Sequence, residues 1–289
     1  MKTIWVTGSK GQLGTELRLQ HEKLAHSNFL FTDIAELDLK DERLVREFVL
    51  QHKPEFIINC AAFTNVDKAE SNIGPAYMLN RDIPELLSRI SLETNCILIH
   101  ISTDYVFDGL NCRPYKEEDA TSPQSVYGAS KLAGEIEVLK NYRNIIIRTS
   151  WLYSAYGTNF LKTMLRLGKE RDKLNVVYDQ VGTPTSASDL ANEILHITGQ
   201  LLSTEENMGG IYNFSNEGVC SWYDFAVEIM KIAGLNCAIS PITSDKYPSP
   251  VNRPAYSVLN KSKITETFGK SIPYWKESFD KVYNQIVHI

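Results

Sequence analysis

The side chains best suited to proton transfer are a tyrosine and a lysine four residues apart. Tyr127 and Lys131 fall in a predicted helix over 126–139, where this spacing places both on one face. A phenol with a pKa near ~10 exchanges protons poorly at neutral pH, and a nearby ammonium lowers that pKa by stabilising the phenolate. The pair can therefore protonate a carbonyl oxygen. The alternative is an amphipathic helix in which the two residues share a face by chance.

Thr103 supplies a third group for the same chemistry. It follows a buried predicted strand over 97–102, and open α/β sheets bind ligands beyond the carboxyl ends of their strands. Its hydroxyl could orient the oxygen that Tyr127 protonates. Thr103, Tyr127 and Lys131 are therefore the candidate catalytic residues. They predict chemistry at a carbonyl or alcohol carbon, with the hydride carried by a nicotinamide cofactor.

Three glycines indicate where such a cofactor binds. Gly8, Gly11 and Gly14 follow the first predicted strand with the spacing G-x-x-G-x-x-G and lead into a helix. Glycine lets the backbone turn sharply and approach a pyrophosphate, which then meets the free amides of the helix N-terminus. No Gly-Lys-Ser/Thr follows, so the loop is not a nucleotide-triphosphate loop of the Walker type.

An acidic residue after the second predicted strand bears on the choice of cofactor. Asp33 lies 19 positions beyond Gly14, close to the offset of about 20 at which an acid binds the adenosine ribose. An acid there favours NADH, whereas Lys10 in the glycine loop could pair with the 2′-phosphate of NADPH. The residues leave this preference open, and Asp33 could instead cap a turn.

Alternating strands and helices must position these groups. Short apolar runs predict strands over 4–7, 29–32, 56–60, 97–102, 145–149 and 174–178. Amphipathic patterns between them predict helices over 12–24, 41–52, 75–94, 126–139, 159–168 and 186–200. This order predicts an α/β fold with a Rossmann-like, doubly wound parallel sheet.

The pattern changes near residue 200, which suggests two parts. We expect a dinucleotide-binding domain over 1–150, with 174–200 and part of 210–220 returning to its sheet. The remainder, 151–173 and 201–289, forms mainly a smaller substrate-binding lobe. It contains a helix over 221–233 with Ser221 as N-cap and a proline-punctuated stretch over 240–254, which predicts no regular element.

Composition excludes several other classes of protein. The chain has 289 residues, with 30 Lys and Arg against 35 Asp and Glu, a net charge of −5. That charge gives no broad electrostatic basis for binding nucleic acid or membrane. The five cysteines lack the paired spacing of zinc sites, so no metal is expected. Neither a signal peptide nor an apolar run of the ~20 residues that span a bilayer is evident, so the cytoplasm is the expected compartment.

Longer motifs carry a specific resemblance. They are GSKGQLG over 8–14, VDKAE over 66–70, STDYVF over 102–107, YGASKLAGE over 127–135 and DQVGTPT over 179–185. With them the chain resembles the extended short-chain dehydrogenases/reductases and, more narrowly, the dTDP-4-dehydrorhamnose reductases along nearly its whole length. The resemblance implies reduction of the C4 ketone of dTDP-4-dehydrorhamnose to dTDP-L-rhamnose by NADPH, with NADH possible, as the last step of dTDP-rhamnose biosynthesis. It also implies a dTDP-sugar as the ligand and a monomer or homodimer.

The resemblance assigns binding roles to individual residues. The cofactor would contact Gly8, Lys10, Gly11, Gln12, Leu13, Gly14, Asp33, Asp38, Leu39, Ala61, Ala62, Phe63, Tyr127 and Lys131. The sugar would face Asp104, Tyr105, Trp151 and Gln180, and the nucleotide diphosphate would meet Asn159 and Arg253. Asn80 resembles an asparagine that supports the catalytic lysine through water. Arg253 could instead form a surface salt bridge, and Trp151 could be an ordinary core residue.

Two other readings of the same motifs stay open. One is another nucleotide-sugar enzyme, an epimerase or a 4,6-dehydratase, although dehydratases carry an Asp-Glu pair after the threonine and this chain has Asp104-Tyr105. The other is a regulatory subunit that binds NADP without this turnover, as in the beta subunit of methionine adenosyltransferase. The intact set of Thr103, Tyr127 and Lys131 argues against the regulatory reading.

Overall fold

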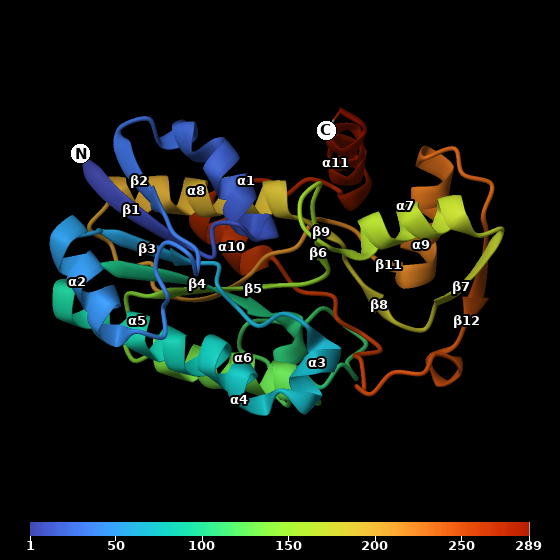
Figure 1. Ribbon diagram of the computed structural model, residues 1–289, viewed down its shortest axis with the longest axis horizontal. Coiled ribbons are helices and arrows are strands. Elements are labelled where there is room, and N and C mark those ends of the chain that lie inside the picture. The colour runs from blue at the N-terminus through green and yellow to red at the C-terminus, as the bar shows by residue number, and fades with distance from the viewer. Residues whose placement is uncertain (289) are drawn as a thin grey trace.

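Six parallel strands form the main sheet of the computed structural model, which describes residues 1–288 (Figure 1). In spatial order they are β10 (Gly210–Asn213), β5 (Ile145–Thr149), β4 (Ile97–Thr103), β3 (Phe56–Asn59), β1 (Lys2–Thr7) and β2 (Ser27–Phe31). The chain runs from β1 to β2 on one side and then returns to β3 on the other. Ligands of open α/β sheets bind at such a reversal. The predicted Rossmann-like fold is confirmed.

Helices cover both faces of this sheet (Figure 1). Ile4 and Val6 of β1 point to one face, where they join the core formed with α1 (Gln12–Gln20), α8 (Ala187–Ser203) and α10 (Ser262–Phe268). Trp5 between them points to the other face, covered by α2 (Glu42–His52), α5 (Ile83–Thr94) and α6 (Val126–Val138). Burial on both sides explains why the strands read as continuous apolar runs.

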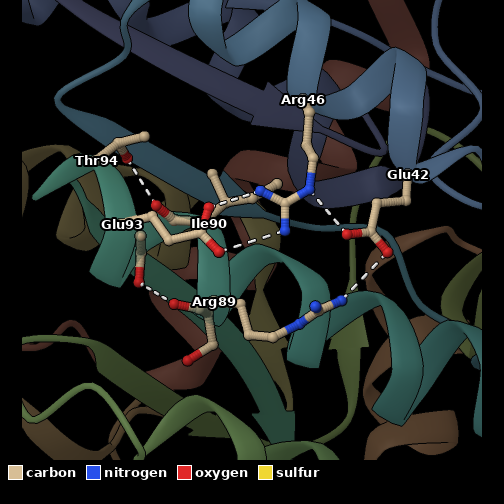
Figure 2. Close-up of polar contacts among 8 residues, drawn as sticks. Glu42, Arg46, Arg89, Ile90, Glu93 and Thr94 are labelled. Atoms are coloured by element: carbon tan, nitrogen blue, oxygen red, sulfur yellow. Dashed lines mark hydrogen bonds and ion pairs between the residues drawn. The ribbon is translucent and has the colours of Figure 1, made fainter.

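Ion pairs link two of these helices at the surface (Figure 2). Arg46 of α2 donates to Glu42 at 2.8 Å and to Glu93 of α5 at 2.6 Å. Arg89 of α5 donates to Glu42 at 3.2 Å. Salt screens such exposed pairs, so they add little to stability. Both helices are held mainly by the side chains that they bury in one core, among them Val45 and Val49 of α2 and Leu86 and Ile90 of α5.

The segment predicted as one helix over 75–94 is interrupted by a π-helical turn. It consists of α4 (Ile73–Tyr77), the turn η2 (Met78–Asp82) and α5, and α3 (Val66–Ser71) precedes it. Asn80 in the turn is fully buried and donates to the Ser130 hydroxyl of α6 at 2.9 Å. Gly134 allows this approach, since a Cβ there would lie 2.0 Å from the Asn80 carbonyl oxygen. Turns of this kind are frequent at functional sites.

A second apolar core lies beside the main sheet (Figure 1). It is formed by α7 (Phe160–Glu170), β7 (Lys173–Val177), α9 (Trp222–Ile232), β12 (Ala238–Ile242) and α11 (Trp275–His288). Ser221 caps α9 as predicted, and Asp224 completes a capping box with it. Two short pairs adjoin this core, β6 (Leu152–Tyr153) with β9 (Thr185–Ser186) and β8 (Val181–Gly182) with β11 (Cys220–Ser221). We propose that this core defines the smaller lobe.

Two expectations about this part of the chain were wrong. Residues 174–178 do not return to the main sheet, because β7 pairs with β12 in a separate two-stranded sheet. The stretch over 240–254 is also not wholly irregular, since it contributes part of β12 and a 3₁₀ turn, η4 (Ser244–Lys246). Pro241 is tolerated in β12 because each strand of a two-stranded sheet has a free edge. By contrast, α8 packs on the main sheet and β10 forms its edge, as expected for 186–200 and 210–220.

Two kinds of feature are absent from residues 1–288. No helix in this range is long and apolar enough to cross a membrane. No group of three or more His, Cys, Asp or Glu side chains in the same range is placed to hold a metal ion.

Candidate active site

The glycine loop forms a close-packed turn between β1 and α1. Gly8 has a φ of +60°, and a Cβ there would lie 2.6 Å from the backbone nitrogen of Ala61. A Cβ on Gly14 would lie 2.4 Å from the Gly8 carbonyl oxygen. Gly11 is the N-cap of α1 and offers no side chain to its first amides. Those amides remain available to an anion, so the loop fits the pyrophosphate of a dinucleotide.

A cavity of about 460 Å³ opens beside this loop. Eight of the expected cofactor residues line it: Gly8, Lys10, Gly11, Asp33, Asp38, Leu39, Ala61 and Ala62. Leu13 points instead into the main core, and Gly14 packs on the loop backbone. The backbone of Phe63 is clamped by Asn80, which accepts from its amide at 2.9 Å and donates to its carbonyl at 3.0 Å. Asn80 thus holds the loop after β3.

Charged residues at one end of the cavity form a connected set. Asp33 accepts from the backbone amide of Lys10 at 2.9 Å. The Lys10 ammonium pairs with Glu36 at 2.7 Å, and this hydrogen bond is the main cause of the lowered pKa of Glu36. Glu36 is not among the residues singled out from the sequence. Its other oxygen accepts from the Asp33 amide at 3.0 Å, and no spacing rule marks these contacts in the sequence.

The candidate catalytic residues come from two neighbouring elements. Thr103 ends β4, and Tyr127 and Lys131 lie one turn apart on α6, whose N-cap Ser125 accepts from the Gly128 amide at 3.1 Å. Gly128 lets α6 approach the turn η3 (Asp104–Val106), since a Cβ there would lie 2.2 Å from the Tyr105 carbonyl oxygen. This contact brings the Tyr127 ring edge-on to Tyr105, with centroids 5.5 Å apart.

Burial dominates the acidity of Tyr127. Desolvation raises the pKa of its phenol, the Thr103 hydroxyl lowers it by hydrogen bonding, and the charge of Asp104 raises it further. The pKa of Tyr127 is raised and not lowered, so the expected lowering by Lys131 is wrong. Lys131 lies against β4 instead, where its Nζ donates to the Ile101 carbonyl at 2.5 Å. Tyr127 therefore keeps its proton until an acceptor oxygen develops negative charge, and the raised pKa makes it a weaker acid than a free phenol.

Lys131 is itself almost completely buried. Its side chain is only 2% exposed, and desolvation lowers its pKa to about 8. The nearest carboxylate on α6, Glu135, raises that pKa but is engaged in a bidentate pair with Arg148 at 2.9 and 2.7 Å. The second polar neighbour of Nζ is Nε2 of His100, at 3.3 Å. His100 was missed in the sequence, although a histidine inside the apolar run ILIHI is an available signal.

The residues expected to face the sugar adjoin this group. Thr103 donates to Asp104 at 2.9 Å, and burial raises the pKa of Asp104 to about 7. The Tyr105 hydroxyl lies 3.5 Å from Nη1 of Arg253. Arg253 and Gln180 line a second cavity of about 390 Å³, together with Ser244, Asp245, Tyr247, Ser249, Pro250, Val251 and Asn252. Tyr105 therefore connects Tyr127 to the wall of the second cavity.

Trp151 has an unusual backbone conformation for a bulky residue. Its φ is +47°, a region that only glycine adopts without strain. The indole stacks on Trp222 with centroids 3.5 Å apart and planes at 8°. Gly182 makes room for it, because a Cβ there would lie 2.7 Å from the indole ring. The surrounding residues thus fix the orientation of Trp151.

Asn159 serves the fold as well as the predicted site. Its Oδ1 caps α7 by accepting from the Lys162 amide at 3.0 Å. Its Nδ2 donates to Gln12 at 2.8 Å and to the Ser154 carbonyl at 2.8 Å. The structure places Asn159 next to Gln12 of the glycine loop and not in the wall of the second cavity.

The doubly wound sheet carries the glycine loop with its cavity, and beside them the group of Thr103, Tyr127 and Lys131. These features define a nicotinamide-dependent oxidoreductase of the short-chain dehydrogenase/reductase class. A family model described as the RmlD substrate binding domain matches residues 1–288. The dTDP-4-dehydrorhamnose reductase of Aggregatibacter actinomycetemcomitans is 38% identical, and the match covers 98% of each chain. The chain belongs to the dTDP-4-dehydrorhamnose reductase family.

Solved structures agree with this assignment. The dTDP-4-dehydrorhamnose reductase of Clostridium acetobutylicum is 40% identical, with a TM-score of 0.93 over 99% of each chain. The dTDP-4-dehydrorhamnose reductase of Bacillus anthracis, determined in complex with NADP, is 35% identical, with a TM-score of 0.92 over 99% of this chain and 100% of that chain. Both likenesses extend through the smaller lobe.

Proposed function

We propose that the protein uses NADPH to reduce the C4 ketone of dTDP-4-dehydrorhamnose, giving dTDP-L-rhamnose in the last step of dTDP-rhamnose biosynthesis. The observation that carries this proposal is the series of contacts between the two cavities. Ala61 lines the first cavity, and its amide donates to Asn59, which reaches Lys131 through His100. Tyr105 packs on Tyr127 and reaches Arg253, which lines the second cavity. The proton donor is therefore between a cofactor site and a site for an anionic ligand.

The residues of the chain divide the reaction between them. NADPH, when bound, supplies the hydride that the ketone carbon accepts. Thr103 orients the ketone oxygen, and Tyr127 gives its phenolic proton to that oxygen as the negative charge develops. One hydride and one proton convert the ketone into the alcohol. Lys131 fixes the Tyr127 face of α6 to β4 through the Ile101 carbonyl.

The binding roles follow from the two cavities. The glycine loop holds the pyrophosphate of the cofactor, and Asp33 and Lys10 meet the adenosine ribose. Arg253 binds the diphosphate of the nucleotide sugar through its guanidinium, while Asp104, Tyr105, Trp151 and Gln180 surround the sugar. We further propose that the protein works in the cytoplasm as a monomer or homodimer, without nucleic-acid or membrane partners.

A direct assay tests this function. The protein is incubated with dTDP-4-dehydrorhamnose and either NADPH or NADH, absorbance loss is followed, and the product is identified by NMR. We expect dTDP-L-rhamnose with both cofactors, and its formation should be far slower with Tyr127→Phe. Cofactor binding without turnover, together with co-purification of an adenosyltransferase, would favour the regulatory reading. A nicotinamide that stays tightly bound through purification, with interconversion of C4 epimers, would favour an epimerase.

A further inference from the structure

The Thr103 hydroxyl has a single proton and two acceptors beside it. Its Oγ1 lies 2.9 Å from Oδ1 of Asp104, and it also forms a hydrogen bond with the Tyr127 phenol. The backbone amide of Tyr105 donates to the same Oγ1 at 3.3 Å. A hydroxyl can accept two hydrogen bonds but donate only one. Thr103 can therefore donate to Asp104 or toward Tyr127, and not to both.

The protonation state of Asp104 decides between these two directions. An ionised carboxylate can only accept, so it takes the Thr103 proton in a charge-assisted hydrogen bond. A protonated carboxyl can instead donate to Thr103 Oγ1, and the Thr103 proton is then free to point toward Tyr127. The distance of 2.9 Å between the two oxygens fits a hydrogen bond in either direction.

The surroundings of Asp104 favour the protonated carboxyl. The residue is 3% exposed, and its Oδ2 is buried without a hydrogen-bond partner in residues 1–288. The groups that stabilise its charge are neutral donors, namely the hydroxyls of Thr103 and Ser257 and the backbone amides of Asp104 and Tyr105. These donors offset burial only in part, so the pKa of Asp104 is raised to about 7. Asp104 thus keeps its proton in a pH range where an exposed aspartate is ionised.

The unpartnered oxygen of Asp104 also indicates which oxygen carries this proton. A proton on Oδ2 would have no acceptor in residues 1–288, and a buried donor without a partner is costly. A proton on Oδ1 has Thr103 Oγ1 as its acceptor at 2.9 Å. The protonated carboxyl therefore donates from Oδ1 to Thr103.

The titratable groups that face Asp104 are themselves neutral or already paired. Tyr105 on the same turn and Tyr127 on α6 both keep their protons, because burial raises the pKa of each phenol. On the side of the smaller lobe, the Arg253 guanidinium faces the Tyr105 hydroxyl and pairs with Asp67. The direction of the Thr103 hydrogen bond thus follows the proton of Asp104.

We propose that Asp104 is a positioning residue whose carboxyl proton, donated to Thr103, turns the Thr103 hydroxyl toward Tyr127 and the ketone oxygen. In this state the ketone oxygen accepts from both hydroxyls, and Tyr127 is still the group that transfers a proton. When Asp104 is ionised, Thr103 donates to Asp104 and the ketone oxygen loses one donor. The effect on turnover rests on the function proposed above, whereas the direction of the hydrogen bond does not.

Infrared spectroscopy of the full-length protein tests the hydrogen-bond direction without turnover. Difference spectra between pH 6 and 9 isolate the C=O band of a carboxyl that ionises in this range, and Asp104→Asn identifies the band of Asp104. We expect a band that is present at pH 6 and lost at pH 9. It should move to higher frequency in Thr103→Val, where the proton has lost its acceptor, and stay in place in Thr103→Ser. The absence of this band at pH 6, or a band that Thr103→Val leaves unmoved, would overturn the proposal.

The pH dependence of hydride transfer tests the effect on the reaction. The rate is measured in single turnovers with saturating NADPH and dTDP-4-dehydrorhamnose. The ratio of the wild-type rate to that of Asp104→Asn should fall by roughly tenfold between pH 6 and 8, because complete loss of one donor to a developing oxyanion costs about 10²- to 10³-fold. This ratio cancels the titration of Lys131, whose pKa is about 8. A ratio that does not change with pH would overturn the proposal.

Thr103→Val separates the hydrogen bond from the charge of Asp104. Without the Thr103 hydroxyl, ionisation of Asp104 removes no donor from the ketone oxygen. The fall with pH, now measured against the double variant of Thr103→Val with Asp104→Asn, should therefore disappear. A fall of wild-type size would show that the charge of Asp104 acts directly on the reacting groups, and would overturn the role of Thr103. An infrared band that behaves as expected without any turnover would contradict the proposed function alone.

Discussion

Arg253 donates from Nη2 to the Asp67 carboxylate at 2.8 Å, across 186 residues of chain. Its Nη1 faces the Tyr105 hydroxyl at 3.5 Å, and its Nε is buried without a partner. Buried donors normally have a hydrogen-bond partner, and a surface salt bridge does not explain a buried Nε that lacks one. A bound anion would supply the missing acceptor. Asp67 therefore holds Arg253 beside the second cavity and lies near whatever anion it binds.

Replacement of Arg253 should weaken binding of the nucleotide sugar selectively. A charge-assisted hydrogen bond contributes about 1.5–3 kcal/mol, so Arg253→Ala should raise KM for the dTDP-sugar by roughly 10- to 100-fold. The affinity for NADPH should stay unchanged, as measured by fluorescence titration. Asp67→Asn is the matched control, because it removes the competing carboxylate and should leave KM unchanged or lower it. If Arg253→Ala lowers Tm and leaves KM intact, the guanidinium is only a structural ion pair.

Loss of the Tyr127 hydroxyl should abolish most turnover. Tyr127→Phe keeps the ring that packs on Tyr105 but removes the proton donor, so kcat should fall by about 10²- to 10⁴-fold, the usual contribution of general acid catalysis. Cofactor affinity should stay near the wild-type value. Stopped-flow hydride transfer and fluorescence titration measure the two quantities. A loss of cofactor binding would show instead that Tyr127 is structural.

Glu36 should influence the choice between NADPH and NADH. Its carboxylate pairs with the Lys10 ammonium at 2.7 Å and adds negative charge next to Asp33. Glu36→Gln frees Lys10 for a 2′-phosphate, so the ratio of kcat/KM for NADPH over NADH should rise several-fold, and less at high salt. Glu47→Gln is a matched control, since Glu47 pairs with Arg43 on α2. An unchanged ratio in Glu36→Gln would show that Lys10 does not meet the 2′ position.

Asp104 should make stability depend on pH. Burial raises its pKa in the folded state to about 7, above the unfolded value of 3.8. Its contribution to stability is therefore complete below about pH 4 and is lost as the pH rises through 7. Asp104→Asn removes this loss. Its free energy of unfolding should therefore exceed that of the wild type at pH 8 by about 4 kcal/mol and be close to it at pH 4.

Urea unfolding at pH 4, 6 and 8 measures this difference. Asp108→Asn provides a control of opposite sign, because the Tyr115 hydroxyl lowers the pKa of Asp108 and its contribution is lost as the pH falls. Equal free energies of unfolding for wild type and Asp104→Asn at pH 8 would show that folding does not raise the pKa of Asp104.

The sequence predicts the main sheet well because its strands are buried on both faces. β1, β3, β4 and β5 are short apolar runs bounded by polar residues, and each appears close to its predicted position. β7 has the same local appearance, but its sheet depends on a partner more than 60 residues later that contains Pro241. A local pattern indicates a strand and does not identify its partner.

The same distinction applies to the site. The sequence singles out Tyr127 and Lys131 by their four-residue spacing. It singles out Thr103 by its position at the end of a predicted strand. The contact of Asn59 with His100 depends on the register of β3 against β4, and the stacking of Trp151 on Trp222 depends on the positive φ of Trp151. Neither property is visible in one sequence without the three-dimensional pairing.

The proposed reaction passes a hydride to C4 of the sugar while Tyr127 supplies the proton. NADPH that carries deuterium at nicotinamide C4, in each of its two stereoisomers, follows this transfer to dTDP-4-dehydrorhamnose. We expect that one stereoisomer alone gives dTDP-L-rhamnose with deuterium at sugar C4, detected by ¹H and ²H NMR, and that Tyr127→Phe slows this transfer. Product without deuterium from either stereoisomer, or deuterium at another sugar carbon, would contradict it.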